Sequence, residues 1–347
     1  MELQEIVRPL IEWYQANKRD LPWRREATPY RVWISEIMLQ QTRVEAVKGY
    51  FTRFIEALPD VQSLASCSEQ QLLKLWEGLG YYNRARNLQK AAQVLVAQYG
   101  GQLPADYDAL LSLPGIGPYT AGAIASISYG IAQPAVDGNV LRVISRITAS
   151  HADISDPATR ILVGDELRKV MPVLEPGTFN QSLMELGATV CVPNGMPDCK
   201  NCPVYRLCEG RKQGVAPDLP VKTAKKPRKL EHRTILLLVR DHRIALRRRP
   251  PKGLLAGLWE LPSLSGEAGQ AEAVAAVRGW GLEPLRVQPL GKARHIFTHV
   301  EWRMTGLRIT VEEASPSEEL VWAGPDQLRE EYPLPSAFRA YLLAVEA

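Results

Sequence analysis

The sequence lacks the features that would place the chain in a membrane or outside the cell. No apolar run approaches the roughly 20 residues that a membrane-spanning helix needs. The N-terminus, MELQEIVRPLIEWYQ, is an amphipathic pattern with acidic residues and not a signal peptide. Cysteine is scarce, with five in 347 residues, and four of these are clustered. Such a cluster is not a disulfide framework, so we expect a cytoplasmic protein with no membrane partner.

The chain also lacks a strong charge of either sign. Its 42 lysines and arginines nearly balance 38 aspartates and glutamates, which leaves a formal charge of +4. Nucleic-acid binding therefore cannot be argued from the total charge. Local basic clusters suit a phosphate partner better, and they lie at Arg24–Arg25, Arg84–Lys90 and Lys222–Lys229.

The hydrophobic pattern divides the chain into two parts. Over residues 1–212 apolar residues recur at helical spacing, which predicts an all-α region. Residues 213–232 hold three prolines and a lysine run, as linkers do. Residues 233–347 are predicted to form a separate α+β domain. Its strand candidates are Thr234–Val239, Arg243–Arg247 and the region Phe297–Ile309, and its helix candidate is Ala271–Arg278.

A glycine-rich stretch organises the helical region. Residues 113–120 read LPGIGPYT and lie between two helix candidates. We expect Gly115 and Gly117 to adopt positive φ, and Pro118 suits the first turn of a helix. A helix–hairpin–helix of this kind presents free amides at a helix N-terminus and can bind phosphate. The alternative is an ordinary helix corner in which glycine caps the first helix.

Two carboxyl groups are candidates for acid–base chemistry. Glu36 has apolar neighbours on both adjoining helical turns, so burial should raise its pKa and keep it protonated as a general acid. Asp137 precedes the apolar run 140–147 and can cap that helix as an anion. Taken alone, each residue is more often a solvated glutamate or a structural cap. Together, an acid and a carboxylate can cleave a glycosidic bond, which in a duplex requires base flipping.

Four cysteines follow the helical region as C-x7-C-x2-C-x5-C. Thiolates at such spacing in a cytoplasmic chain are ligands of zinc or of an iron–sulfur cluster. The spacing alone leaves both metals open. The four residues are Cys191, Cys199, Cys202 and Cys208.

Four motifs in order resemble the MutY family of adenine DNA glycosylases, within the endonuclease III superfamily. They are SEIMLQQT (35–42), GLGYYNRARNL (78–88), LPGIGPYTAGAI (113–124) and AVDGNVLRV (135–143). The resemblance implies an all-α helix-hairpin-helix glycosylase domain, divided into a six-helix part (about 20–135) and a cluster-bearing part (1–19 with 136–212). It implies a monomeric, monofunctional enzyme of base excision repair. Its substrate would be adenine paired with 8-oxoguanine or G in double-stranded DNA.

The resemblance also implies roles for individual residues. Glu36 would protonate the adenine, and Asp137, with Asn139 beside it, would stabilise the sugar cation. The adenine pocket would contain Arg19, Trp23 and Leu39. DNA contacts would come from Gln41, Thr42 and Tyr81 at 8-oxoguanine, and from Gly115, Gly117 and Thr120 at the hairpin. Tyr119 occupies the position of the Schiff-base lysine of bifunctional relatives, so efficient strand cleavage is not expected.

For the cysteines the resemblance favours a [4Fe–4S] cluster, although the family usually has six residues between the first two ligands and this chain has seven. Residues 246–249 and 253–262 resemble the Nudix-like domain of the family. A working Nudix hydrolase needs a set of carboxylates on one helix face to hold Mg²⁺. In the matching segment after Leu261 this chain has only Glu267 and Glu272, so that set is missing. The domain should therefore bind 8-oxoguanine without hydrolysis, through Phe297, Thr298 and His299.

Three alternatives remain open. An endonuclease III-like glycosylase and AP lyase for oxidised pyrimidines is opposed by Tyr119 and by the extra domain. A nucleotide diphosphohydrolase is opposed by the missing acidic set. A DNA-damage binding module without catalysis is opposed only by the presence of both Glu36 and Asp137.

Overall fold

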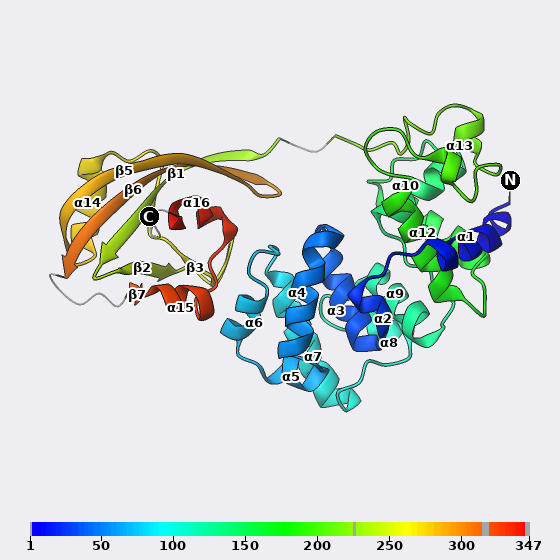
Figure 1. Cartoon of the computed structure of the whole chain (residues 1–347), viewed down its shortest axis with the longest axis horizontal. Coiled ribbons are helices and arrows are strands. Elements are labelled where there is room, and N and C mark those ends of the chain that lie inside the picture. The colour runs from blue at the N-terminus through cyan, green and yellow to red at the C-terminus, as the bar shows by residue number, and fades with distance from the viewer. Residues whose placement is uncertain (1, 225–226, 314–318, 344–347) are drawn as a thin grey trace. The chain divides into compact units, whose positions relative to one another are not determined.

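The computed structural model describes residues 2–224, 227–313 and 319–343. Two residues of the predicted linker, 225–226, and two segments of the predicted C-terminal domain, 314–318 and 344–347, lie outside the described residues. The chain divides into two compact units (Figure 1). The first consists of Met1–Cys67 and Arg86–Ala224, and the second of Ser68–Ala85 and Lys225–Ala347.

The first unit is helical, and its described residues contain no strand, which confirms the predicted all-α class. In the part of the chain that the structure describes, no helix is long and apolar enough to span a bilayer. The helices are α1 (Gln4–Asn17), α2 (Pro22–Arg25), α3 (Pro29–Leu39), α4 (Val44–Ala57), α5 (Val61–Ser66), α7 (Asn83–Tyr99), α8 (Tyr107–Leu111), α9 (Pro118–Tyr129), α10 (Gly138–Ile147), α11 (Pro157–Lys169), α12 (Pro176–Thr189), η1 (Cys199–Asn201) and α13 (Glu209–Lys212).

Local sequence explains where the helices of the site begin. Thr28 caps α3 by accepting a hydrogen bond from the Arg31 amide, and Pro29 follows in the first turn. Gly117 precedes Pro118 at the start of α9, and Asp137 caps α10. Helix α12 packs against α1, α9 and α10, while α3 packs against α9. These contacts bring the starts of α9 and α10 close to the middle of α3.

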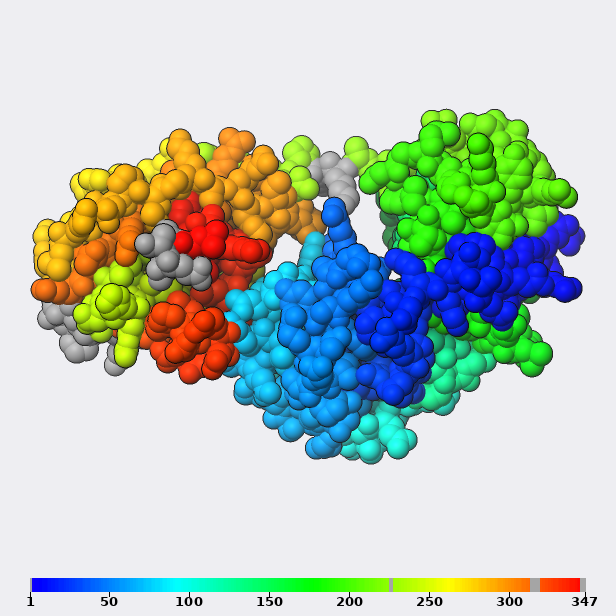
Figure 2. Space-filling model, in the orientation of Figure 1, coloured from blue at the N-terminus to red at the C-terminus, as the bar shows by residue number. Residues whose placement is uncertain are grey.

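The N-terminal helix shares a hydrophobic core with the later helices of the unit. Ile6 and Leu10 of α1 pack in one buried cluster with side chains of α10, α11 and α12. Figure 2 shows the N-terminal residues, in dark blue, lying against the green residues of the same unit. The core thus joins residues that lie more than 120 positions apart in the sequence.

Residues 213–223, predicted as the start of a linker, pack on the first unit. Leu219 is buried, and its carbonyl accepts a hydrogen bond from Arg146 Nε (2.8 Å). The Ile154 amide donates to Val221 O (3.1 Å), and the Thr223 amide donates to Asp153 Oδ2 (3.1 Å). The first strand of the second unit begins at Lys229. The predicted bounds of 213–232 therefore take in residues of both units and are too wide.

A mixed sheet forms the centre of the second unit. Strand β1 pairs in parallel with β6, and β6 pairs antiparallel with β5, in the order β3-β2-β1-β6-β5. Ile235 and Leu237 of β1 face one core, while Leu236 and Leu238 face the other with α14. The elements are α6 (Glu69–Leu75), β1 (Lys229–Arg240), β2 (Arg243–Arg248), β3 (Trp259–Glu260), β4 (Ser263–Ser265), α14 (Gln270–Gly279), β5 (Leu282–Ile296), β6 (Val300–Glu313), β7 (Val321–Ala323), α15 (Pro325–Glu330), η2 (Ser336–Phe338) and α16 (Arg339–Leu342). The predicted α+β class is confirmed.

The sequence pattern missed strand β5. Pro284 and Pro289 interrupt its alternation, and the pairing with β6 shifts register near Pro284 and again after Leu290. Proline is tolerated because β5 lies at the edge of the sheet, where a missing amide breaks no ladder. Residues 297–299, predicted to begin a strand, form instead the connection between β5 and β6.

Candidate active site

The glycine-rich stretch forms a hairpin between α8 and α9. Gly115 has a φ of +77°, and a Cβ there would lie 2.6 Å from Asn87 Cβ, so only glycine fits. Gly117 was predicted to need positive φ as well, and this was wrong. Its φ is −95°, and it serves as the residue before the first turn of α9. Both glycines are exposed, which leaves the positive end of α9 accessible to a phosphate.

Thr120 of the hairpin is buried. It is 1% exposed, and its hydroxyl accepts a hydrogen bond from Gln40 Nε2 (3.4 Å). Its side chain therefore packs α9 against the end of α3, and its role as a DNA contact stays a prediction.

One cavity of about 660 Å³ lies among α3, α9, α10 and α12. This volume is within the usual range for small-ligand sites. The predicted acid and carboxylate share this cavity. The predicted residues that line it are Arg19, Trp23, Glu36, Leu39, Gln41, Thr42, Tyr119, Asp137 and Asn139. Those that do not are Tyr81, Gly115, Gly117, Thr120, Phe297, Thr298 and His299.

Glu36 is 6% exposed, which confirms the predicted desolvation. Burial raises the pKa of Glu36 to about 7, with a smaller raising effect from the Asp137 charge. The Tyr119 hydroxyl donates a hydrogen bond to Glu36 Oε2 and acts in the opposite direction. A carboxyl group with this pKa is about half protonated at neutral pH and can deliver a proton.

Asp137 caps α10, as predicted. Its Oδ1 accepts a hydrogen bond from the Val140 amide (2.7 Å), and its Oδ2 accepts one from Asn139 Nδ2 (2.8 Å). Burial raises the pKa of Asp137, while these hydrogen bonds lower it. Asp137 thus has more donors and a positive helix end, whereas Glu36 has the single hydroxyl of Tyr119. The proton of the pair is therefore favoured on Glu36.

A chain of hydrogen bonds continues from Asp137 toward the cysteines. Asn139 Oδ1 accepts from Arg142 Nη2 (2.8 Å). Arg142 also donates to Gly187 O (2.7 Å) and to Cys191 O (2.9 Å). At Gly187 an added Cβ would lie 2.7 Å from Asn139 Cβ, so glycine allows α12 to approach α10 this closely. The carboxylate is thereby fixed to the backbone that carries the first cysteine.

Sequence reasoning did not place most of the other lining residues in the cavity, among them five from α2, α12 and the segment after α13. Gln181 and Glu185 lie one turn apart on α12, so the helical period could have paired them once one was known. Lys222 was noted only as part of a basic cluster, because it lies in the segment taken for a linker. The five are Arg24, Gln181, Met184, Glu185 and Lys222.

Two of the predicted 8-oxoguanine contacts have unusual backbone conformations. Gln41 and Tyr81 have positive φ values of 58° and 49°. Non-glycine residues held in this region are strained and cluster at functional sites. Within the second unit, Tyr81 Oη lies 2.8 Å from the hydroxyl of Thr298. The Phe297 ring packs edge-on against Trp302, with 4.9 Å between ring centroids, which anchors the 297–299 connection.

The four cysteines line one cavity of about 20 Å³. A single zinc ion would need four sulfurs about 2.3 Å from one point. Among the residues that the structure describes, no three metal-binding side chains converge in this way. Burial raises the pKa of Cys202 to about 12, so its thiol stays protonated at neutral pH unless a bound cation displaces the proton.

The extra residue between the first two cysteines lies in an exposed loop. Residues 193–196 are exposed, and Gly195 turns with a φ of +79°. The chain returns at Pro197, which is buried and lines the cysteine cavity, and the Asp198 amide donates to Val190 O (3.0 Å). The insertion thus leaves all four cysteines at the cavity.

The two acidic residues of the degenerate Nudix segment have structural roles. Glu272 accepts a hydrogen bond from the Gly269 amide (2.8 Å) and caps α14. Glu267 Oε1 lies 2.9 Å from His232 Nδ1. Neither belongs to a group of three metal-binding side chains among the described residues.

The helix-hairpin-helix, the paired carboxyl groups and the cysteine cavity define a DNA glycosylase of base excision repair. The sequence model of the HhH-GPD superfamily base excision DNA repair protein matches residues 34–169, and that of the NUDIX domain matches residues 234–344. The adenine DNA glycosylase of Rattus norvegicus is 35% identical over 368 residues, which cover 89% of this chain and 71% of the relative. The chain therefore belongs to the adenine DNA glycosylase family.

Solved structures share the helical region. A thermostable thymine-DNA glycosylase is 27% identical with a TM-score of 0.55, covering 60% of this chain and 97% of that chain. Endonuclease III in a non-covalent DNA complex is 26% identical with a TM-score of 0.52, covering 62% and 99%. These two structures cover 60% and 62% of this chain, whereas the adenine DNA glycosylase relative covers 89% of it. The endonuclease III-like alternative is therefore outweighed.

Proposed function

We propose that this chain is a monomeric, monofunctional glycosylase that removes adenine paired with 8-oxoguanine or G in duplex DNA. The observation that carries the proposal is the placement of Glu36 and Asp137 in one cavity. One of these carboxyl groups is buried beside a hydroxyl, and the other is held by donors at a helix N-terminus. The membership of the chain in the adenine DNA glycosylase family supports adenine as the base.

The chemistry follows from this pair. The adenine must be flipped out of the duplex into the cavity. Glu36 donates its proton to the departing adenine, which takes the electron pair of the C1′–N9 bond. The Asp137 carboxylate stabilises the positive charge on the sugar. Water then adds to C1′ and loses a proton to a carboxylate of the cavity, which completes the hydrolysis.

The wall of the cavity supplies binding for the base. Trp23 is 6% exposed and offers a flat apolar surface, and Leu39 adds apolar contact. Arg19 supplies hydrogen-bond donors. We assign these three residues to the adenine pocket.

We further propose that Cys191, Cys199, Cys202 and Cys208 hold a [4Fe–4S] cluster. The membership of the chain in the adenine DNA glycosylase family supports this choice over zinc, and all four cysteines line one cavity. Arg146 Nη1 lies 3.4 Å from Cys191 Sγ and would stabilise the thiolate. A [4Fe–4S] cluster can transfer electrons, but base hydrolysis needs no electron transfer. We therefore assign the cluster a structural role.

Cys208→Ser is expected to lower the melting temperature and to abolish the iron and sulfide content expected for a [4Fe–4S] cluster. Cys208 packs in the core of α1, α10 and α12, so losing the cluster should loosen the helices that hold Asp137. Iron and acid-labile sulfide analysis with a thermal scan would check this. Cys67→Ser is the matched control, because Cys67 lies far from the cavity in sequence and lines no part of it. Zinc in place of iron in the native protein would contradict the proposal.

For lesion recognition we propose that Tyr81 and Thr298 act together. Tyr81 is 46% exposed, so its ring is available to stack on a base. The hydroxyl groups of the two residues lie 2.8 Å apart, and each can exchange this partner for 8-oxoguanine. The positive φ of Tyr81 supports a functional site here.

Thr298→Ala is expected to erode discrimination between A:8-oxoG and A:G substrates by roughly tenfold, the effect of one hydrogen bond to a charged or polar group. The alanine removes the hydroxyl and leaves Phe297 anchored on Trp302. The ratio of single-turnover rates on the two duplexes measures the effect. Thr310→Ala in β6 serves as control. Unchanged discrimination in Thr298→Ala would remove this residue from the lesion site.

One assay tests the function as a whole. Purified protein is mixed with duplexes containing A:8-oxoG, A:T or thymine glycol, with or without alkali afterwards. We expect nicking at adenine only opposite the lesion and only after alkali. Trapping by borohydride as the main product would contradict a monofunctional enzyme and would direct attention to Lys222, which lines the cavity. Release of thymine glycol would favour the endonuclease III-like alternative.

A further inference from the structure

Glu185 is a buried carboxylate that the proposed mechanism does not use. It lies on α12, is 1% exposed, and lines the same cavity as Glu36 and Asp137. Burying a charge is costly unless partners compensate, and even a compensated pair adds little stability over apolar packing. Such a residue beside a catalytic pair therefore points to a role in the reaction.

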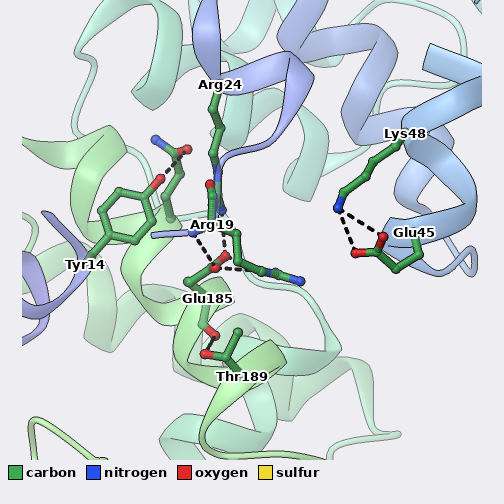
Figure 3. A network of polar contacts seen from close by, with 8 residues as sticks. Tyr14, Arg19, Arg24, Glu45, Lys48, Glu185 and Thr189 are labelled. Atoms are coloured by element: carbon green, nitrogen blue, oxygen red, sulfur yellow. Dashed lines mark hydrogen bonds and ion pairs between the residues drawn. The ribbon is translucent and has the colours of Figure 1, made fainter. Parts of the chain in front are cut away.

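The partners of Glu185 are two arginines from the segment between α1 and α3 (Figure 3). Arg19 donates to Oε1 through its backbone amide (3.1 Å) and Nε (2.6 Å), and to Oε2 through Nη2 (3.0 Å). Arg24 donates to Oε2 through Nη2 (2.8 Å) and to Arg19 O through Nη1 (3.2 Å). Burial raises the pKa of Glu185, but these hydrogen bonds outweigh it and bring the pKa to about 2. Glu185 is therefore ionised throughout the neutral range.

The arrangement leaves the cavity wall positively charged. One carboxylate faces two guanidinium groups, so one positive charge is not neutralised within the trio. Both arginines line the cavity, with side chains 33% and 16% exposed. Adenine presents unprotonated ring nitrogens that accept such donors.

We propose that Glu185 is a positioning residue of the reaction, which holds the guanidinium groups of Arg19 and Arg24 at the cavity wall so that they bind adenine. The proposal rests on the proposed function and deepens it.

A second consequence concerns Glu36. Burial raises its pKa, and the Arg24 charge acts in the opposite direction. Glu185 is bonded to Arg24 and offsets that charge. The other titratable or charged groups around the cavity are Arg19, Tyr119, Asp137, Arg142, Arg160 and Lys222. Removing the negative charge of Glu185 should therefore lower the pKa of Glu36.

The test uses the full-length protein with Glu185→Gln and Glu185→Asp. Single-turnover release of adenine from an A:8-oxoG duplex is followed from acidic to alkaline pH, beside duplex affinity. For Glu185→Gln we expect a rate loss on the order of 100-fold, as for misplaced binding groups, and an alkaline limb moved to lower pH. Glu185→Asp keeps the charge but shortens the reach, so its rate should fall while its alkaline limb stays at the native position.

Glu260 offers a matched control in the second unit. It is 2% exposed and is also held by two arginines, Arg247 (3.0 Å) and Arg249. Glu260→Gln should lower the melting temperature about as much as Glu185→Gln. It should leave the rate and the pH profile of adenine release unchanged.

The outcomes separate the possibilities. A native rate and alkaline limb in Glu185→Gln, with only the melting temperature lowered as in Glu260→Gln, would make Glu185 structural and overturn the proposal. Should Glu185→Gln not fold, a native rate in Glu185→Asp overturns positioning on its own. If the native protein releases no adenine at all, the proposed function fails first, and this inference fails with it.

Discussion

Replacing Glu36 by glutamine is expected to abolish adenine release while leaving duplex binding intact. Glutamine has the shape of glutamate and fits a site that is only 6% exposed, but it has no proton to deliver. General acid catalysis contributes about 10²–10⁴-fold, so the single-turnover rate should fall by at least roughly 100-fold. Band-shift titration of the same duplex measures binding. Loss of binding together with rate would show that Glu36 is structural.

The pH profile gives the same prediction a second readout. Burial raises the pKa of Glu36 to about 7, so the active, protonated form declines as the pH rises through about 7. The native rate should fall there, and the residual rate of Glu36→Gln should lack that limb. Because the folded pKa lies above the unfolded value, stability from this group is present below the unfolded pKa and is lost as pH rises through about 7. Glu36→Gln should therefore melt no lower than the native protein at alkaline pH.

The burial of Glu36 and the helix cap formed by Asp137, the proposed catalytic pair, could be predicted from sequence because each residue obeys a local rule. Glu36 has apolar neighbours at helical spacing, and burial of that helix follows from the pattern alone. Asp137 stands immediately before an apolar helix, where a cap is expected. The hairpin was equally local, although only Gly115 needs its positive φ and Gly117 does not. The order of the four sequence motifs then indicated one family for the whole helical region.

Glu185 could not be found in this way. Its partners Arg19 and Arg24 lie more than 160 residues earlier, and only the packing of α12 against α1 brings the three together. A glutamate within an apolar helix gives no sign of which cations it meets. The position of Lys222 at the cavity was missed for a related reason. Its proline-rich segment is held on the first unit by hydrogen bonds with Ile154 and Asp153, and these long-range contacts have no local pattern. Non-local contacts of this kind leave no periodic signal.

Strand β5 was missed for a different reason. Pro284 and Pro289 are evidence against a strand in any local pattern, and only the edge position of β5 makes them acceptable. The position of β5 matters for the proposed lesion site, because residues 297–299 form the turn that follows this strand. Placing Thr298 at an exposed turn instead of within a strand brings its hydroxyl within hydrogen-bonding distance of Tyr81.

Asp137→Asn should reduce adenine release by about 10²–10³-fold, the scale found when one preorganised electrostatic group is removed from an active site. Asparagine caps helices about as well as aspartate, so α10 and its hydrogen bond to the Val140 amide should persist. What disappears is the negative charge beside the sugar, and with it the stabilisation of the cation. The single-turnover rate on A:8-oxoG duplex measures the loss, with duplex affinity and melting temperature recorded alongside.

Asp156→Asn is the control for this last variant, because Asp156 caps α11 in the same manner, with its side chain accepting from the Ala158 amide (2.9 Å), and lies outside the cavity. If Asp137 acted only as a helix cap, Asp137→Asn and Asp156→Asn would have the same rate of adenine release. A charge acting on the sugar predicts that only Asp137→Asn loses rate, while both keep their fold. Equal and native rates in the two variants would mean that the cation is stabilised by some other group, since a neutral amide would then do everything that the carboxylate does. Together with Glu36→Gln, the pair distinguishes a proton donor from a fixed anion: raising the pH should slow the native enzyme through Glu36, and Asp137→Asn should stay slow at every pH.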